Sequence, residues 1–138
     1  MKGKEFWIKY PFCNLFLNRY TPKVLMAAGT GIASFLSYLG YIKKTSVSSL
    51  TYVFHSVRTS QELIDKFVEI PYNVYYFKFV TRETCQNTQN RRIEISEILK
   101  LNVSEDTDFY ICGSMEFVNK FEKGLRENGF KNIYSESW

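Results

Sequence analysis

Short runs of apolar residues alternate along the chain with stretches in which apolar residues recur every three or four positions. The first run, Val24–Ala28, is too short for a helix and is typical of a strand buried on both faces. The turn Gly29-Thr30-Gly31 follows, where glycine allows the chain to change direction tightly. The apolar residues after the turn share one face of a predicted helix, namely Ile32, Phe35, Leu36 and Leu39.

The rest of the chain repeats this alternation. Further β-rich runs predict strands over residues 50–55, 74–80, 109–112 and 132–135. Thr59 and Glu62 have the spacing of a capping box. They predict a helix whose buried face is Leu63, Ile64, Phe67 and Val68. A short helix is predicted around 95–99. Ser114 can cap a last helix, which ends near Gly129 and whose predicted buried face is Met115, Val118, Phe121 and Leu125.

Strands that alternate with helices at this spacing predict an α/β domain with a parallel, doubly wound, Rossmann-like sheet. We expect five strands in the order 3-2-1-4-5, with helices on both faces. Ligands of such sheets bind at the carboxyl edge, at the point where the connections that leave two adjacent strands lead in opposite directions. The turns 29–31 and 112–114 should therefore be neighbours and flank one crevice.

Residues 24–42 also allow two other interpretations, a glycine turn that binds no ligand and a membrane span. The free backbone N–H groups of the glycine turn suit a phosphate, but the glycines can also serve only as a tight turn. The stretch carries no charge over 19 residues, so its length also suits a membrane span. Glycine, serine and threonine dilute its hydrophobicity, and the strand–helix alternation needs it as the first unit. We therefore expect no membrane span.

Composition narrows the class of protein. With 138 residues, 45% of them hydrophobic, the chain suits one packed domain. Its net charge of +4 comes from scattered basic residues, so no nucleic-acid partner is expected. Cys13, Cys85 and Cys112 have no CxxC spacing, which argues against a disulfide framework and against a metal site. Since the N-terminus shows no secretory signal, we expect a reducing, cytoplasmic location.

Six short motifs occur in order along the chain. They are Ala28-Gly-Thr-Gly-Ile-Ala33, His55-Ser-Val-Arg58, Val80-Thr-Arg-Glu83, Asn90-Arg-Arg-Ile93, Ile111-Cys-Gly113 and a C-terminal pair of Glu136 and Trp138. From about Lys23 to Trp138, this pattern resembles the nucleotide-binding domain of the plant-type ferredoxin–NADP reductase superfamily, and most closely its bacterial ferredoxin (flavodoxin)–NADP reductases. Ser34 and Ser114 depart from the pattern, because the family usually has proline at the first position and proline or asparagine at the second.

The resemblance implies that residues 21–138 are an NAD(P)-binding domain and that residues 1–20 are the end of a flavin domain or a docking segment. Residues 5–20 hold six aromatic side chains, and so short a run cannot bury itself. The family's flavin-binding motif, Arg-x-Tyr-Ser/Thr, does not occur in the sequence. FAD is therefore expected only if a missing domain or a partner supplies it.

The resemblance also implies roles for individual residues. The nicotinamide-side ribose and the pyrophosphate would be received by Gly29, Thr30 and Gly31. The nicotinamide would lie beside Cys112 and Gly113, with Ser114 completing their turn. The adenosine half and its 2′-phosphate would be held by Arg58, Thr81, Arg82 and Arg92. The residues implied in catalysis are Cys112, Glu136 and Trp138, the last of which would cover the flavin ring.

We therefore expect an oxidoreductase module that presents NADPH for hydride transfer to a flavin held by another domain or subunit. NADP(H) is expected rather than NAD(H), because Arg82, Arg91 and Arg92 share one loop and no acidic residue is placed to accept a pair of ribose hydroxyls. The expected partner is a flavin domain or an electron-transfer protein such as ferredoxin or flavodoxin. The alternatives are a non-catalytic binding or regulatory module and a truncated reductase fragment.

His55, the only histidine, has no serine, cysteine or carboxylate at a catalytic spacing. We expect it to be structural or a minor nucleotide contact.

Overall fold

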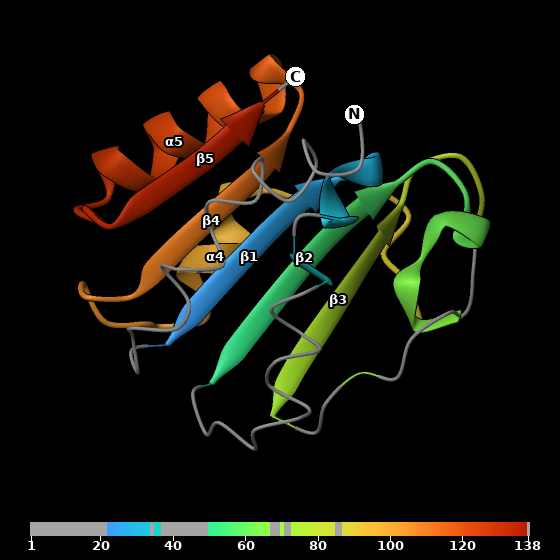
Figure 1. The fold of residues 1–138 in the computed structure, drawn as a ribbon, viewed down its shortest axis with the longest axis horizontal. Helices are drawn as coiled ribbons and strands as arrows, with labels where there is room; N and C mark the ends of the chain where they lie inside the picture. Colours follow the sequence, from blue (N-terminus) through green and yellow to red (C-terminus); the bar gives the residue numbers. More distant parts are fainter. Residues whose placement is uncertain are drawn as a thin grey trace, which may run out of the picture.

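The computed structural model describes residues 22–33, 35–36, 50–66, 70, 73–84 and 87–137. These residues contain a five-stranded sheet (Figure 1), made of β1 (Lys23–Ala28), β2 (Thr51–Val57), β3 (Val74–Val80), β4 (Asp108–Gly113) and β5 (Ile133–Ser137). All neighbouring strands are parallel, and their order is β3-β2-β1-β4-β5. The predicted fold class and strand order are confirmed.

Strand β1 lies at the centre of the sheet. Its Leu25 stands opposite Val53 on β2 and opposite Tyr110 on β4. At its amino end, Lys23 Nζ lies 3.9 Å from Asp108 Oδ2, and both side chains are fully buried. A strand that is paired along both edges and covered on both faces must be apolar, which is why the first apolar run of the sequence takes this place.

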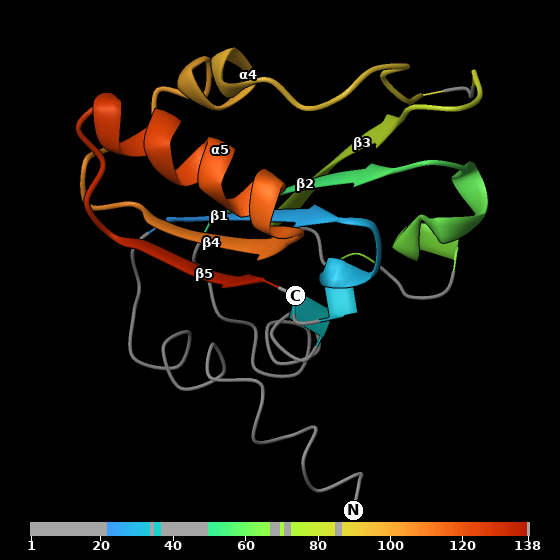
Figure 2. The ribbon, with the colours of Figure 1, turned by 90° about the horizontal axis from the view of Figure 1, so that it is seen from above.

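Helical segments cover both faces of the sheet (Figure 2). On one face, α4 (Ile95–Leu99) and α5 (Met115–Glu127) share a hydrophobic cluster with alternate residues of β1 and β4. On the opposite face, the 3₁₀ turns η1 (Gly29–Ile32) and η3 (Ile64–Lys66) contribute Ile32 and Ile64 to a second cluster. Successive strand residues point to opposite faces, so each central strand supplies both clusters.

The segment after β2 differs from the predicted helix. Thr59 and Glu62 form the expected capping box, but it opens the 3₁₀ turn η2 (Ser60–Glu62). Leu63 then takes an extended conformation, with φ −73° and ψ 134°, before η3 begins. Leu63 and Ile64 are buried as predicted. Phe67 and Val68 lie outside the described residues. One extended residue therefore divides the segment into two short turns.

Helix α5 begins where it was predicted, because Ser114 Oγ accepts a hydrogen bond from Phe117 N–H at 3.2 Å. The predicted buried face is right for Val118, Phe121 and Leu125. It is wrong for Met115, which is 61% exposed. Helical side chains lean towards the helix N-terminus, so the first residue of α5 projects past the part of the helix that packs on the sheet.

The helix predicted after the glycine turn lies only partly within the described residues. Residues 29–32 form η1, and Ala33, Phe35 and Leu36 continue in helical conformation. Ile32 and Phe35 are buried as predicted, whereas Leu36 is exposed. Phe35 belongs to the hydrophobic cluster on the η1 face of the sheet, whereas Leu36 is 36% exposed, so the predicted face is only partly covered at this point. The remaining residue of the predicted face, Leu39, is outside the described residues.

Two predictions concern parts of the chain that the structure describes in part or not at all. The segment 1–20, with its aromatic residues, lies outside the described residues. The stretch 24–42, considered as a membrane span, begins as strand β1. Among the described residues there is no helix whose length and hydropathy would let it cross a membrane.

Replacing Gly113 with alanine is expected to destabilise the fold. An added Cβ would lie 2.9 Å from Phe117 Cδ2 and 3.1 Å from Ala28 Cβ, so the ring and α5 would have to shift. We expect the free energy of unfolding in urea to fall by about 1–3 kcal/mol. In the double variant with Phe117→Leu, the two losses should be less than additive, because leucine leaves room for the new methyl group. Strictly additive losses would contradict this explanation.

Candidate functional site

A cleft of about 1010 Å³ opens at the carboxyl edge of the sheet. Its lining comes from the turn after β1, the ends of β2 and β3, the segment before α4 and the first turns of α5. It contains six of the residues predicted to bind the cofactor, which are Gly29, Arg58, Thr81, Arg82, Arg92 and Ser114. The prediction that the first glycine turn and the turn after β4 flank one crevice therefore agrees with the geometry.

Backbone hydrogen bonds hold two arginines side by side at the ends of β2 and β3. Thr81 N–H donates to Val57 O at 3.0 Å, and Arg82 N–H donates to Arg58 O at 2.9 Å. Glu83 Oε1 accepts from Ser60 N–H at 2.8 Å and ties the same two loops together. The two guanidinium groups thus extend from neighbouring, connected positions.

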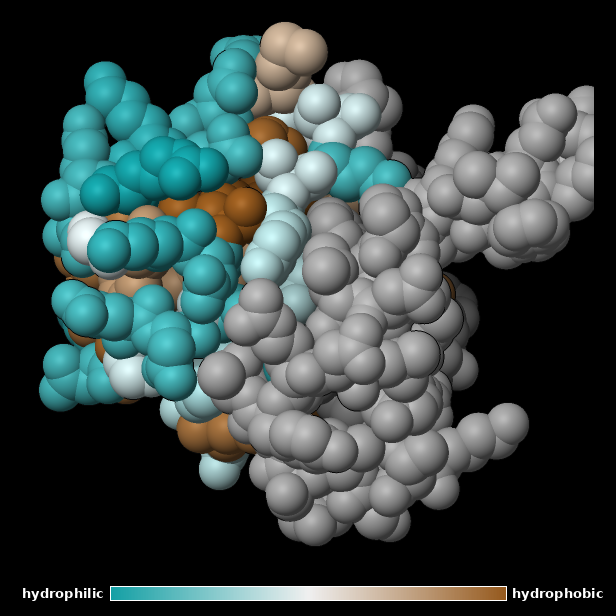
Figure 3. All heavy atoms as spheres, turned by 60° about the vertical axis from the view of Figure 1, so that its left-hand side comes forward, coloured by the Kyte–Doolittle hydropathy of each residue, from teal (hydrophilic) through white to brown (hydrophobic). Residues whose placement is uncertain are grey.

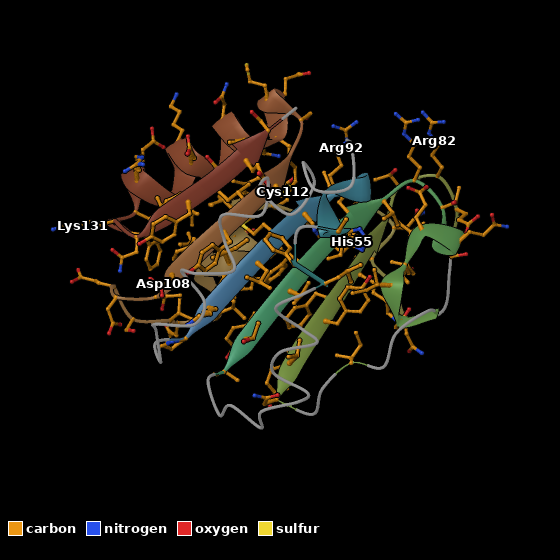
Figure 4. The ribbon with its side chains drawn as sticks, in the orientation of Figure 1. His55, Arg82, Arg92, Asp108, Cys112 and Lys131 are labelled. Carbon is orange, nitrogen blue, oxygen red and sulfur yellow. The ribbon has the colours of Figure 1, made fainter. Side chains whose placement is uncertain are left out.

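Arg92 approaches the cleft from a different segment. In Figure 4, Arg82 and Arg92 both extend beyond the carboxyl end of the sheet, with Arg92 nearer to α5. Both side chains are exposed. Within the described part of the chain, neither they nor Arg58 has an ion-pair partner. Three guanidinium groups are therefore available to an anion in the cleft.

The third arginine of the predicted loop is placed differently. Arg91 Nη2 lies 2.8 Å from Glu97 Oε1, and its guanidinium stacks over Phe79 at 5.4 Å. Arg91 is not on the cleft lining. The side chain closes the loop onto α4, so only two of the three arginines on which the NADP(H) prediction rested face the cleft.

Helix α5 contributes a wall that sequence reasoning missed. The cleft lining includes Glu116, Phe117, Lys120 and Lys123. In Figure 3, which brings the left-hand side of Figure 1 forward, the coloured part of the surface is mostly hydrophilic, with some hydrophobic atoms exposed within it. The three-residue spacing of the two lysines indicated a shared helix face, but only the position of α5 beside the loop before α4 turns that face to the cleft.

The charged side chains of the lining are mostly basic, since five are basic and two, Glu62 and Glu116, are acidic. Glu62 bears on the expectation that no acidic residue is placed to accept a pair of ribose hydroxyls, because it lines the cleft. Its Oε2 accepts from Thr59 N–H and from Thr59 Oγ1–H, both at 3.3 Å. The capping box thus engages this carboxylate and reduces its capacity to bind ribose hydroxyls.

The predicted nicotinamide-side residues lie next to the cleft rather than all on its lining. Cys112 is 2% exposed and belongs to the hydrophobic cluster on the η1 face, and Gly113 is buried beside it. Glu136 on β5 is the register partner of Cys112. Trp138 lies outside the described residues. The catalytic roles expected of Cys112, Glu136 and Trp138 stay predictions.

The glycine turn contacts a buried histidine. Gly29 has φ +57°, a left-handed conformation that favours glycine. Gly31 is buried, and Thr30 belongs to the same 3₁₀ turn. His55 Nε2 lies 2.9 Å from Gly29 O, and His55 Nδ1 lies 2.8 Å from Tyr76 Oη. The structural role expected for His55 agrees with its complete burial.

Burial also shifts the pKa values of His55 and Tyr76. Loss of solvent lowers the pKa of His55, although the Gly29 carbonyl and the charges of Glu62 and Asp65 oppose the shift. Burial likewise raises the pKa of Tyr76. Both side chains are therefore neutral at pH 7.

Comparison with known protein families gives one match, which covers most of the chain. The family model described as "oxidoreductase NAD-binding domain" matches residues 25–123. No curated protein sequence matches the chain.

Solved structures share the fold. A ferredoxin NADP+ reductase from Neisseria gonorrhoeae with bound FAD and NADP is 25% identical, with a TM-score of 0.69 over 91% of this chain and 58% of that one. The flavohem-like FAD/NAD binding domain of nitric oxide dioxygenase from Vibrio cholerae O1 biovar El Tor is 21% identical, with a TM-score of 0.71 over 88% of this chain and 52% of that one. A flavohemoglobin from Malassezia yamatoensis is 21% identical, with a TM-score of 0.74 over 85% and 31%. The chain thus spans less than two thirds of each.

The lowered pKa of His55 predicts a loss of stability in mild acid. Above the unfolded-state pKa of about 6.5, both states are neutral and the full stability is present. As pH falls below that value, the unfolded chain takes up a proton that the folded chain resists. We expect this difference in proton uptake to lower the free energy of unfolding as the pH falls, by at most about 1.4 kcal/mol per pH unit. Urea denaturation between pH 5 and 7.5 measures it, and the dependence should be smaller in His55→Gln. An equal slope in both proteins would contradict the assignment.

Proposed function

Because this chain belongs to the oxidoreductase NAD-binding domain family, we propose that it binds NADPH and presents the nicotinamide to a flavin held by another domain or subunit. The observation that carries the proposal is the cleft in which the glycine turn and three arginines from separate segments meet. Bound NADPH would supply a hydride, and the chain would bind and orient the nucleotide.

The cleft fits a dinucleotide in size and in charge. Its volume of about 1010 Å³ is at the upper end of the range of small-molecule sites. The pyrophosphate would lie near Gly29, where the turn exposes backbone, and Ser114 and the N-terminus of α5 face the same cleft. Cys112 and Gly113, which directly precede Ser114 in the chain, would border the nicotinamide.

The adenosine half would lie towards the ends of β2 and β3. Arg58, Thr81, Arg82 and Arg92 line that part of the cleft. A guanidinium fork binds a phosphate monoester through paired hydrogen bonds, so we assign the 2′-phosphate to Arg82 and Arg92. The engagement of Glu62 by Thr59 supports NADP(H) rather than NAD(H) as the ligand.

The proposal extends to catalysis and partners. Cys112, Glu136 and Trp138 would border the reacting ring, supported by the register pairing of the first two. The acceptor would be FAD on a flavin domain, and electrons would pass on to a protein such as ferredoxin or flavodoxin. The absence of any pairing pattern among the cysteines supports a reducing, cytoplasmic location.

Removing either cleft arginine should weaken binding of NADPH selectively. We expect Arg82→Ala and Arg92→Ala each to raise the Kd for NADPH about 10- to 100-fold, since each removes a charge-assisted contact worth about 1.5–3 kcal/mol. The Kd for NADH should change little, because NADH has no 2′-phosphate. Fluorescence titration with both nucleotides measures this.

Arg126→Ala is the matched control for these variants. Arg126 is an exposed arginine on the last turn of α5 and is not on the cleft lining. Its replacement should change neither dissociation constant. Equal affinity of the wild-type chain for NADPH and NADH would refute the assignment of the 2′-phosphate.

The 138-residue chain alone should bind the nucleotide without turning it over. Hydride transfer requires an acceptor about 3–3.5 Å from the nicotinamide, and the sequence carries no flavin-binding motif. The measurement is diaphorase activity with NADPH and ferricyanide, with and without added FAD. Turnover at about 1–10³ per second by the chain alone would contradict the proposal of a separate flavin domain.

A further inference from the structure

A chain of hydrogen bonds runs from the glycine turn to the segment that follows Arg58. Gly29 O lies 2.9 Å from His55 Nε2, and His55 Nδ1 lies 2.8 Å from Tyr76 Oη. Tyr76 Oη in turn accepts from Ile64 N–H at 3.1 Å. The chain therefore connects the exit of β1 with β2, β3 and η3, and Figure 4 shows His55 among these strands below the carboxyl edge.

For a neutral imidazole, the Gly29 carbonyl at one ring nitrogen leaves one arrangement of protons that satisfies all of these contacts. The carbonyl of Gly29 can only accept, so His55 Nε2 must carry the imidazole proton. In a neutral ring Nδ1 is then an acceptor, so the hydroxyl of Tyr76 donates to it while its oxygen accepts from the Ile64 amide. The carbonyl of Gly29 thus selects the neutral Nε2–H tautomer, and the hydroxyl of Tyr76 satisfies Nδ1 in that tautomer.

We propose that His55 is the positioning residue of the nucleotide-binding turn, which it fixes by donating from Nε2 to Gly29 O while Tyr76 donates to Nδ1. The proposal rests on the proposed function for its ligand but concerns residues of this chain alone. Both ring nitrogens are engaged within the protein and the ring is fully buried, so His55 does not contact the nucleotide.

The geometry explains why such an anchor matters. Gly29 lines the cleft and holds a left-handed φ of +57°, which an unanchored glycine would exchange readily for other conformations. Tying the carbonyl of Gly29 to β2 fixes the directions of the following peptide groups before a ligand arrives. Because the far end of the chain lies at Ile64, it also fixes the turn relative to the loop that carries Arg58. Preorganisation of this kind lowers the cost of ordering the site on binding.

Three substitutions separate positioning from general stability. His55→Gln keeps an N–H donor that can reach the place of Nε2, whereas His55→Leu keeps only the bulk. Thr51→Val is the matched control, since Thr51 is another buried polar residue of β2 but lies at the opposite end of the strand. We expect the Kd for NADPH to rise about two- to tenfold in His55→Leu, corresponding to one buried hydrogen bond. It should return to near the wild-type value in His55→Gln and stay unchanged in Thr51→Val.

Two measurements on the free protein test the anchor without any nucleotide. Because His55 is the only histidine, its ¹⁵N chemical shifts report the tautomer without ambiguity, and Nε2 should be the protonated nitrogen at pH 7.5. Amide hydrogen exchange at residues 29–32 should accelerate in His55→Leu but not in His55→Gln or Thr51→Val.

The outcomes distinguish this inference from the proposed function. An Nδ1–H tautomer, or exchange at the turn that is unchanged in His55→Leu, would overturn the positioning role whether or not a nucleotide binds. Equal losses of affinity in His55→Gln and His55→Leu would also overturn it. Failure of the wild-type chain to bind NADPH, combined with the expected tautomer and exchange pattern, would instead refute the proposed ligand and leave the anchor of the turn established.

Discussion

The parallel pairing of β1 with strands on both of its edges is the constraint on which the site depends. The connections that leave β1 and β4 begin at the same carboxyl edge, but they lead to helical segments on opposite faces of the sheet. Because these two connections diverge, neither fills the space between the ends of the two strands. The cleft is therefore a consequence of strand order, and its polar residues come from whichever segments end there.

Two kinds of polar group serve the cleft in different ways. Exposed arginines such as Arg82 and Arg92 keep their water until an anion replaces it, so they cost the fold little. The contact between His55 and Gly29 is buried, where a missing partner would carry a large desolvation penalty. The buried group thus constrains the shape of the site, while the exposed groups provide its charge.

The strand β1 and the start of α5 were predictable because their determinants are local. The buried run at 24–28 and the capping residue Ser114 each specify an element through their own neighbours in sequence. Predictions failed where the outcome depended on distant packing. Met115 continues the helical apolar period but lies past the packed face, and Leu63 interrupts a helix that its capping box had favoured. Helical periodicity records which residues share a face but not where that face stops being covered.

The sequence by itself determined the strand order, the two turns that meet at the carboxyl edge and the basic residues near them. Only the tertiary structure decided which basic residues face the cleft, because a side chain's partners are set by distances in space. Thus Arg91 pairs with Glu97, while Lys120 of α5 joins the cleft lining. The same holds for His55, whose partners Gly29 and Tyr76 are 26 and 21 residues away along the chain and become neighbours only when β1, β2 and β3 pair.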